Sequence, residues 1–387
     1  MSPRHAAGVL LTSGSGRVGA VFLITLMLIS LFVLVRFPMD FGPQRWNNPA
    51  VWADNPKAVP PAWAGPFLGD DVVSPHTVLR ASEPSSVAPA GGAETQLYSF
   101  TYDYQGGTPP TFIALTVSDV RFQSRPPVIS IQVKRPDGRA LTLFRQVVRG
   151  PRQGEEAPYI RYGETPLRIG LTGERDVAVA LSDFLSEAYG VRANPNDLQG
   201  RTEEAMFGEP VPGESLAFAP LAGRYEFTVQ ALMGDAADEA GSVKLVLGGS
   251  TYGAMGTDAL GRDLALGLLF GFPVALAIGL STSLLATTIG TFMGIMSGFL
   301  AGKTDLAIQR FADIWSNIPL LPILIFLIFI LGQKLWLVVV IMILFGWPGL
   351  TIVVRSMVLQ IRTGQLVEAT RALGASRRRI MFRHILF

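Results

Sequence analysis

Long uncharged, apolar stretches alternate with polar regions along this chain. Four such stretches occur, covering Val18 to Val35, about Phe272 to Ala301, about Ile318 to Leu331, and Leu335 to Val354. A helix of about 20 apolar residues crosses the hydrocarbon core of a bilayer, so the pattern predicts an α-helical polytopic membrane protein with four spans. The first stretch follows Arg4 and Arg17, and Arg36-Phe37-Pro38 is not a small-residue cleavage site. These features favour a membrane anchor over a cleaved signal peptide.

Between the first two apolar stretches, apolar and polar residues alternate strictly in several short segments. They cover residues 98–103, 129–134, 225–229 and 243–247. Pro136-Asp137-Gly138 supplies a hairpin turn between the second segment and the next apolar residues. Short alternating segments separated by turns predict an antiparallel, sandwich-like β domain.

The residues between and around the alternating segments are predicted to be mostly irregular. A Pro/Trp-rich stretch from Trp46 to Trp63 is expected to be irregular chain near the membrane surface, where tryptophan is favoured. A Ser/Ala/Pro/Gly linker is expected from about Ala81 to Glu94, and a short helix within residues 180–215.

Basic residues determine the predicted orientation, because Lys and Arg concentrate in cytoplasmic loops. They cluster before the first span, after the second and after the fourth, whereas the loop between the third and fourth spans carries only Lys334. The protein is therefore expected to lie in a membrane, in five parts. These parts are a cytoplasmic N-terminus (1–17), a first transmembrane helix (18–36), an extracytoplasmic β-rich domain (37–255), a transmembrane core with spans two to four (256–355) and a cytoplasmic loop (356–387).

The amino-acid composition limits the kinds of functional site that this chain can contain. The chain is 49% hydrophobic and only 16% charged, which is too apolar for an ordinary soluble protein. It contains no cysteine, and His5, His76 and His384 lie far apart in sequence. Thiolate sites are thereby excluded, and a multi-histidine metal site or a Ser-His-Asp triad is not expected. We predict no catalytic residue, no cofactor, no metal and no nucleic-acid partner.

The predicted spans contain no ionisable side chain, which leaves backbone carbonyls as the groups that could still form an ion site within them. No Asp, Glu, Lys, Arg or His lies between Leu264 and Gly302, in 318–333 or in 335–354, so a proton relay inside the membrane is not expected. Residues 297–304 resemble a phosphate-binding loop, but Ser297 occupies the place of its first glycine and an apolar span precedes it. Nucleotide binding is therefore not predicted.

The basic C-terminal stretch carries the most specific pattern. Residues 368–387 predict two short helices broken at Gly374, with Ser376 as the N-cap of the second. By helical spacing, one face of the second helix carries Ile380, Met381, His384 and Ile385. Composition alone favours a basic helix on anionic lipid headgroups. The spacing of Glu368-Ala369 to Gly374 instead resembles the EAA coupling loop of ABC importer membrane subunits.

The resemblance assigns a role to several residues of this loop. It implies contact with a separate ATPase for Glu368, Ala369, Gly374, Ala375, Arg379 and Ile385. Thr370 departs from the pattern, since it stands in place of a second alanine, and Phe387 stands where a proline normally follows.

A second motif directly precedes the second apolar stretch. Residues 256–263 resemble the signature of the oligopeptide/dipeptide branch of these permeases, at Gly256, Thr257, Asp258, Gly261, Arg262 and Asp263. From the residues alone, the motif reads as a helix start capped by Thr257 or Asp258, with Arg262 paired to a carboxylate. It thus indicates a family without locating a substrate.

The resemblance covers residues 255–387 closely, the first span loosely and the β domain hardly at all. It implies a type I ABC importer permease fold in the inner (plasma) membrane, with four of its six spans present because the chain ends after the coupling loop. It also implies ABC ATPase subunits, a second permease subunit and an extracytoplasmic substrate-binding protein as partners in peptide import. The chain itself would not be an enzyme, because ATP hydrolysis belongs to the ATPase. The alternative is a membrane-anchored extracytoplasmic β domain for adhesion or sensing.

Overall fold

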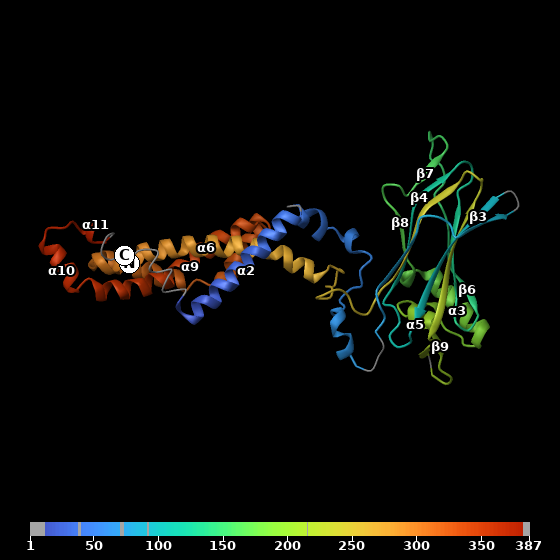
Figure 1. The fold of residues 1–387 in the computed structure, drawn as a ribbon, viewed down its shortest axis with the longest axis horizontal. Coiled ribbons are helices and arrows are strands. Elements are labelled where there is room, and N and C mark those ends of the chain that lie inside the picture. The colour runs from blue at the N-terminus through green and yellow to red at the C-terminus, as the bar shows by residue number, and fades with distance from the viewer. Residues whose placement is uncertain (1–11, 38–39, 70–72, 91–92, 215, 382–387) are drawn as a thin grey trace. The chain divides into compact units, whose positions relative to one another are not determined.

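The computed structural model describes residues 12–37, 40–69, 73–90, 93–214 and 216–381. The chain forms two compact units. One runs from Asp40 to Gly267 and is rich in strands, and the other is helical and comprises the described residues on either side of it (Figure 1).

Apolar helices make up the helical unit. Three are long and apolar enough to cross a membrane: α2 (Gly14–Arg36), α6 (Leu264–Leu300) and α9 (Leu335–Ile361). The helices α7 (Gly302–Ser316) and α8 (Leu320–Leu331) meet the same criterion only as a pair, bent by 71°. The described residues therefore hold three candidate spans, or four if the bent pair is one span.

The helices differ in extent from the apolar stretches that predict them. Ser13 accepts a hydrogen bond from the N–H of Gly16, so α2 begins at Gly14 rather than Val18. The helix α6 starts eight residues before Phe272, because the uncharged sequence from Leu264 continues the helix and Pro273 is accommodated inside it. The predicted third span, Ile318 to Leu331, corresponds to α8, which begins only at Leu320. Pro319 is the N-cap of α8, and the chain bends there.

Glycines on α6 bring it close to α9. Gly290, Gly294 and Gly298 follow each other at four-residue spacing on one face of α6. A Cβ added to Gly294 would lie 2.7 Å from Cβ of Val354 and 2.9 Å from the carbonyl oxygen of Thr351. The buried Thr351 hydroxyl also donates to the carbonyl of Gly290 (3.2 Å). The lack of a side chain at these three glycines of α6 therefore sets the distance between the two helices.

Two antiparallel sheets build the strand-rich unit. In one sheet the order is β1 (Thr77–Ala81), β12 (Glu239–Leu247), β4 (Ile113–Phe122) and β7 (Tyr159–Arg161), with β8 (Leu167–Gly170) also paired to β4. In the other the order is β2 (Ser86–Ala90), β3 (Ala93–Tyr104), β11 (Gly223–Met233), β5 (Val128–Lys134) and β6 (Ala140–Val147). A short pair, β9 (Gly208–Pro210) and β10 (Phe218–Pro220), stands apart.

Both sheets contribute to one hydrophobic core, as the alternating pattern predicts. Tyr98, Phe100 and Tyr102 of β3 are buried, and Val243 and Leu245 of β12 belong to the same cluster. The helix α3 (Arg175–Tyr189) packs on β6 and closes the core, followed by α4 (Pro195–Leu198) and α5 (Thr202–Phe207). The region predicted to hold one short helix thus holds most of three.

The predicted linker from Ala81 to Glu94 is wrong for most of its length. Residues 86–90 form β2, which pairs with β3 from Ser86 opposite Leu97. As an edge strand, β2 has one neighbour and contributes no residue to the core cluster, and its Val87 is 51% exposed. A strand without a buried face does not need alternating hydrophobicity, so the pattern missed it.

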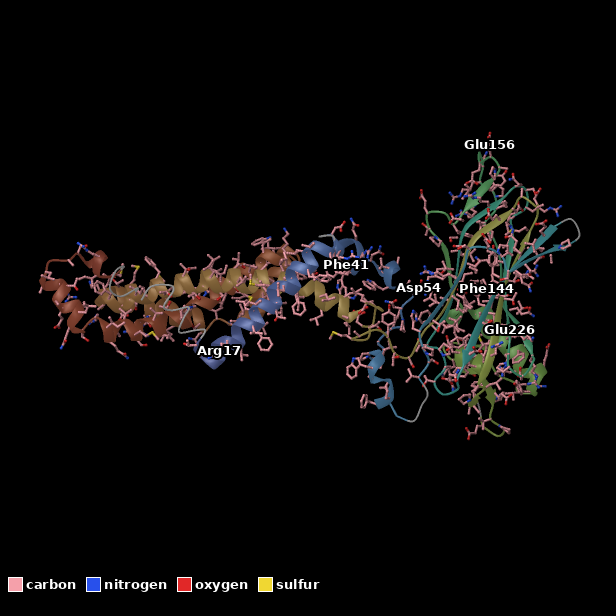
Figure 2. The ribbon with its side chains drawn as sticks, viewed as in Figure 1. Arg17, Phe41, Asp54, Phe144, Glu156 and Glu226 are labelled. Atoms are coloured by element: carbon pink, nitrogen blue, oxygen red, sulfur yellow. The ribbon has the colours of Figure 1, made fainter. Side chains whose placement is uncertain are left out.

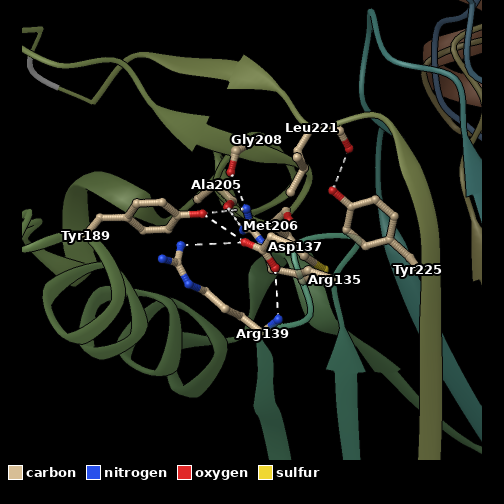
Figure 3. A network of polar contacts seen from close by, with 9 residues as sticks. All are labelled: Arg135, Asp137, Arg139, Tyr189, Ala205, Met206, Gly208, Leu221 and Tyr225. Carbon is tan, nitrogen blue, oxygen red and sulfur yellow. Dashed lines mark hydrogen bonds and ion pairs between the residues drawn. The ribbon is translucent and has the colours of Figure 1, made fainter.

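A buried arginine anchors the β5–β6 hairpin (Figure 3). Arg135 is 1% exposed and donates to the carbonyls of Ala205 (3.2 Å), Met206 (3.1 Å) and Gly208 (2.9 Å) at the end of α5. It also pairs with Asp137 in the turn, with 3.4 Å between Nε and Oδ2. The guanidinium satisfies carbonyls that a helix end leaves unpaired, so this charged group is structural.

Candidate functional site

The basic C-terminal stretch forms two short helices with a break at the expected glycine. The helix α10 (Gln365–Ala372) precedes Gly374, whose φ is +80°, and α11 (Arg377–Ile380) follows. Such an angle favours glycine, because any side chain is strained there. The hydroxyl of Ser376 accepts a hydrogen bond from the N–H of Arg379 (3.3 Å), as an N-cap does.

One face of this loop is occupied by the rest of the chain. Val367 and Ile380 are each 1% exposed and pack on Ile295, Phe299 and Val358, near the adjacent ends of α6 and α9. Ala375 and Met381 lie at the edge of this cluster, which we call the loop core. His384 and Ile385 lie outside the described residues. Buried contacts of the loop therefore hold it on the membrane helices.

The other face of the loop is open. Glu368, Ala369, Gly374 and Arg379 are exposed, whereas Ala375 is half-buried in the edge of the loop core. Leu373 is 88% exposed and Leu366 is 65% exposed. Sequence reasoning missed both leucines, although their seven-residue spacing places them on one helical face. A cleft of about 720 Å³ between the loop and the helix ends is lined by Phe299, Leu300, Arg362, Thr363, Glu368, Arg371, Ala375, Ser376 and Ile380.

A polar network lies near the loop, and sequence reasoning did not predict the ion pair at its centre. The carboxylate of Asp305 accepts two hydrogen bonds from Arg355, both 2.6 Å long, and a third from the hydroxyl of Ser297. Gln309 donates to the same hydroxyl (3.0 Å). The network joins α6, α7 and α9. Ser297, which stands where a phosphate-binding loop would have its first glycine, is fully buried in this network.

Aromatic contacts continue the attachment of α7 along α9. Phe311 stacks on Trp347, with ring centroids 5.7 Å apart and planes inclined by 17°. The indole N–H of Trp315 donates to the carbonyl of Leu344 (2.6 Å). Because α6 also packs on α9 and the loop core rests on both, the loop, α6, α7 and α9 are joined by continuous packing.

The signature before α6 is held together by its own charges. The carboxylate of Asp258 accepts hydrogen bonds from the Arg262 side chain (2.6 Å) and from the N–H groups of Leu260 (2.9 Å) and Arg262 (3.0 Å). Burial raises the pKa of Asp258, but the hydrogen bonds from Arg262 outweigh it, and the pKa lies below its usual value. Asp263, not Thr257 or Asp258, caps α6, because it directly precedes Leu264 and accepts from the N–H of Ala265 (2.9 Å).

The Pro/Trp-rich segment closes around this signature. Thr257 donates to the carbonyl of Pro56 (2.7 Å), and Asn55 donates to the carbonyl of Gly261 (2.9 Å). The guanidinium of Arg262 lies 4.4 Å from the centre of the Trp46 ring. The signature therefore acts as a clasp between the chain after α2 and the start of α6, and its Asp258 and Arg262 are already paired with each other.

Within the strand-rich unit, Asp54, which is labelled in Figure 2, ties the same segment to one of the two sheets. Its carboxylate accepts hydrogen bonds from Arg168 of β8 (3.2 Å) and from Lys244 of β12. Burial raises the pKa of Asp54, yet the two cations hold it below the usual value. Within the part of the chain described by the structure, no group of three or more His, Asp or Glu residues could hold a metal ion.

Comparison with known proteins identifies the C-terminal quarter of the chain. Residues 286–386 match the family described as "Binding-protein-dependent transport system inner membrane component". The chain is 38% identical over 132 residues to the peptidoglycan transport system permease protein YejE of Agrobacterium fabrum, covering 34% of this chain and 35% of that protein. It is 36% identical over 135 residues to the oligopeptide transport system permease protein OppC of Haemophilus influenzae, covering 35% and 43%.

A dipeptide permease gives a similar result. The chain is 36% identical over 131 residues to the dipeptide transport system permease protein DppC of Lactococcus lactis, covering 34% of this chain and 38% of that protein. The matched parts thus span about a third to two-fifths of these relatives. The predicted likeness to the permeases of peptide importers is confirmed for this part of the chain.

Proposed function

Because residues 286–386 belong to the family of binding-protein-dependent transport inner membrane components, we propose that this chain is a transmembrane subunit of an ATP-driven importer of di- or oligopeptides. Permease subunits of this family hydrolyse no ATP themselves. We assign hydrolysis to separate ABC ATPase subunits, and part of the translocation path to a second permease subunit. A substrate-binding protein would deliver the cargo. The relatives named for oligopeptide and dipeptide transport support the substrate class.

The C-terminal loop is the proposed docking element for the ATPase. Its open face presents Glu368, Ala369, Gly374 and Arg379 beside the exposed Leu373. Exposed apolar side chains rimmed by polar residues mark interaction surfaces, and Leu373 lies in such a setting. The inner face, buried in the loop core, gives the loop a firm attachment through which movement reaches α6 and α9. This two-sided arrangement is the observation that carries the proposal.

The proposed topology follows the basic residues. We place the N-terminus and the C-terminal loop in the cytoplasm and residues 37–255 outside, because the Lys and Arg clusters flank the spans on one side. The strand-rich unit would then stand on the side from which peptides arrive. Its clasp to the start of α6 supports a role in receiving the binding protein or shielding the entrance.

The test is to replace Gly374 by valine and to measure both ATPase binding and peptide uptake. At φ +80° with open space around it, Gly374→Val strains the break between α10 and α11 without any steric clash. We expect the membrane-inserted chain to lose co-purification with the ATPase, or to retain it while ATP hydrolysis no longer drives uptake. Gly138→Val is the matched control, since Gly138 has φ +82° and equally open space in the β5–β6 turn.

The control separates strain in general from strain in the coupling loop. Gly138→Val should leave ATPase binding and uptake unchanged. Wild-type uptake by the Gly374→Val variant would remove the coupling proposal. If the wild-type chain, inserted in its own membrane, captured no ATPase, the membrane-anchored β domain for adhesion or sensing would become the better explanation.

A further inference from the structure

The three tryptophans of the Pro/Trp-rich segment have different environments. Trp52 is buried at 5% exposure, and Trp46 lies half-buried over Gly267, where an added Cβ would approach its ring to 2.3 Å. Trp63 is instead 66% exposed. The first two side chains are therefore packed inside the protein, whereas most of the Trp63 side chain stays exposed within the described structure.

An exposed apolar cluster surrounds Trp63. The segment 61–68 contains no charged residue and includes a 3-10 helix over Ala62–Phe67. Phe67 is 81% exposed and Leu68 is 51% exposed, and Met255 is 46% exposed on the neighbouring loop. Between Asp40 and Gly267, Phe67 and Trp63 are the two most exposed large apolar side chains described. We call Trp63, Phe67, Leu68 and Met255 the apolar cluster.

The cluster is fixed rather than loosely attached. The indole N–H of Trp63 donates to the carbonyl of Ala254 (2.9 Å), and the N–H of Ala62 donates to the carbonyl of Gly253 (2.9 Å). The N–H of Tyr252 donates to the carbonyl of Pro60 (2.9 Å). The polar atom of Trp63 is thus satisfied by the protein itself, and its ring is held in place while it stays exposed.

The loop that holds the cluster also holds the first turn of a membrane helix. The N–H of Leu264, the first residue of α6, donates to the carbonyl of Gly256 (3.2 Å). Gly256 lies two residues from Ala254, the partner of Trp63. At about 3.5 Å per residue, the indole attachment lies within roughly 10 Å of the start of α6. This short path keeps the attachment point of Trp63 close to the first turn of α6.

From this placement we propose that the apolar cluster inserts into the headgroup region of the bilayer beside α6. Tryptophan is favoured at this depth, and phenylalanine and leucine are the other side chains that bury at the boundary between headgroups and acyl chains. Because α6 has 37 residues, about 55 Å in length, its first turn can lie in the interface while the remainder crosses the core. The proposal requires only that the chain is membrane-embedded, and it holds whether or not the chain transports peptides.

The test uses the absence of native cysteines. The full-length chain with Phe67→Cys would be spin-labelled and reconstituted alone in liposomes, and the collision rates of the label with oxygen and with a water-soluble nickel chelate would be measured. Oxygen concentrates in lipid and the chelate in water. Val147→Cys, at an exposed position on the edge strand β6 (60% exposed), is the matched aqueous control.

We expect an oxygen-to-nickel accessibility ratio severalfold higher at position 67 than at position 147. Equal ratios would overturn the proposal, because they would place the cluster in water. Low accessibility to both reagents would also overturn it, since it would indicate burial in a protein contact such as a second copy of the chain. Leu68→Cys repeats the measurement if Phe67→Cys does not insert. Failure of the Gly374 experiment would leave this result unaffected.

Discussion

The close contact between α6 and α9 makes a sharp prediction about a single methyl group. In Gly294→Ala, the new Cβ would lie 2.7 Å from Cβ of Val354, whereas carbon atoms pack at about 3.5–4.0 Å. The two helices must therefore separate by about 1 Å, and overpacking of this size costs about 1–3 kcal/mol. Gly279→Ala is the matched control in the same helix, since nothing lies within 4 Å of its added Cβ. By helix propensity alone it should stabilise the helix by about 0.5–1 kcal/mol.

The assay is the labelling rate of a cysteine placed in the same contact. Val358 is 3% exposed and packs against Gly298, so the thiol of Val358→Cys reacts with a maleimide only when the helices open. In this background, Gly294→Ala should speed labelling about 5- to 150-fold, the range equivalent to 1–3 kcal/mol. Gly279→Ala should not speed it. If the two variants label within twofold of each other, the reasoning from glycine packing is refuted.

Two further substitutions test the polar groups. Asp305→Asn breaks the paired hydrogen bonds with Arg355, where the two side chains are 18% and 30% exposed. The loss of roughly 1–2 kcal/mol should speed labelling of the cysteine in Val358→Cys about tenfold. Glu226→Gln removes a charge from an exposed ion pair and should not speed labelling. Burial raises the pKa of Glu203, whose Oε1 has no partner within the described structure. The charged carboxylate therefore opposes folding only above its usual pKa. Glu203→Gln should stabilise the β domain by about 1 kcal/mol at pH 7 and leave it unchanged at pH 4, whereas Glu204→Gln should not stabilise it. The measurement is thermal unfolding of the full chain followed by tyrosine absorbance, because all eight tyrosines lie from Tyr98 to Tyr252, within the β domain. Equal stability of Glu203→Gln and the wild type at pH 7 would contradict the prediction for Glu203.

Local patterns predicted the elements well where burial is one-sided. Tyr98, Phe100 and Tyr102 alternate because one face of β3 meets the core, and that period is visible in the sequence. The pattern failed for β2, whose residues contribute nothing to the core cluster. It also failed for the start of α6, because an apolar sequence does not mark where helix gives way to loop.

The candidate site shows the same division. The roles of Gly374 and Ser376 were predictable because both depend on nearby backbone. Gly374 adopts a positive φ, and the Ser376 side chain caps the N–H of Arg379, three residues later. The pairing of Asp305 with Arg355 was not, since fifty positions separate them. In the sequence, Leu373 cannot be told apart from a buried apolar helix residue, and only the structure shows that it is exposed.

The sequence by itself determined the apolar spans, the strands with one buried face, the glycine break of the C-terminal loop and the likeness to importer permeases. These features depend on residues close together in the chain, so their spacing records them. The tertiary structure decided which charged groups are already paired, which tryptophans are buried and which glycines face a neighbouring helix. Those properties depend on contacts between distant segments, such as Asn55 with Gly261, and a linear pattern does not encode which segments meet.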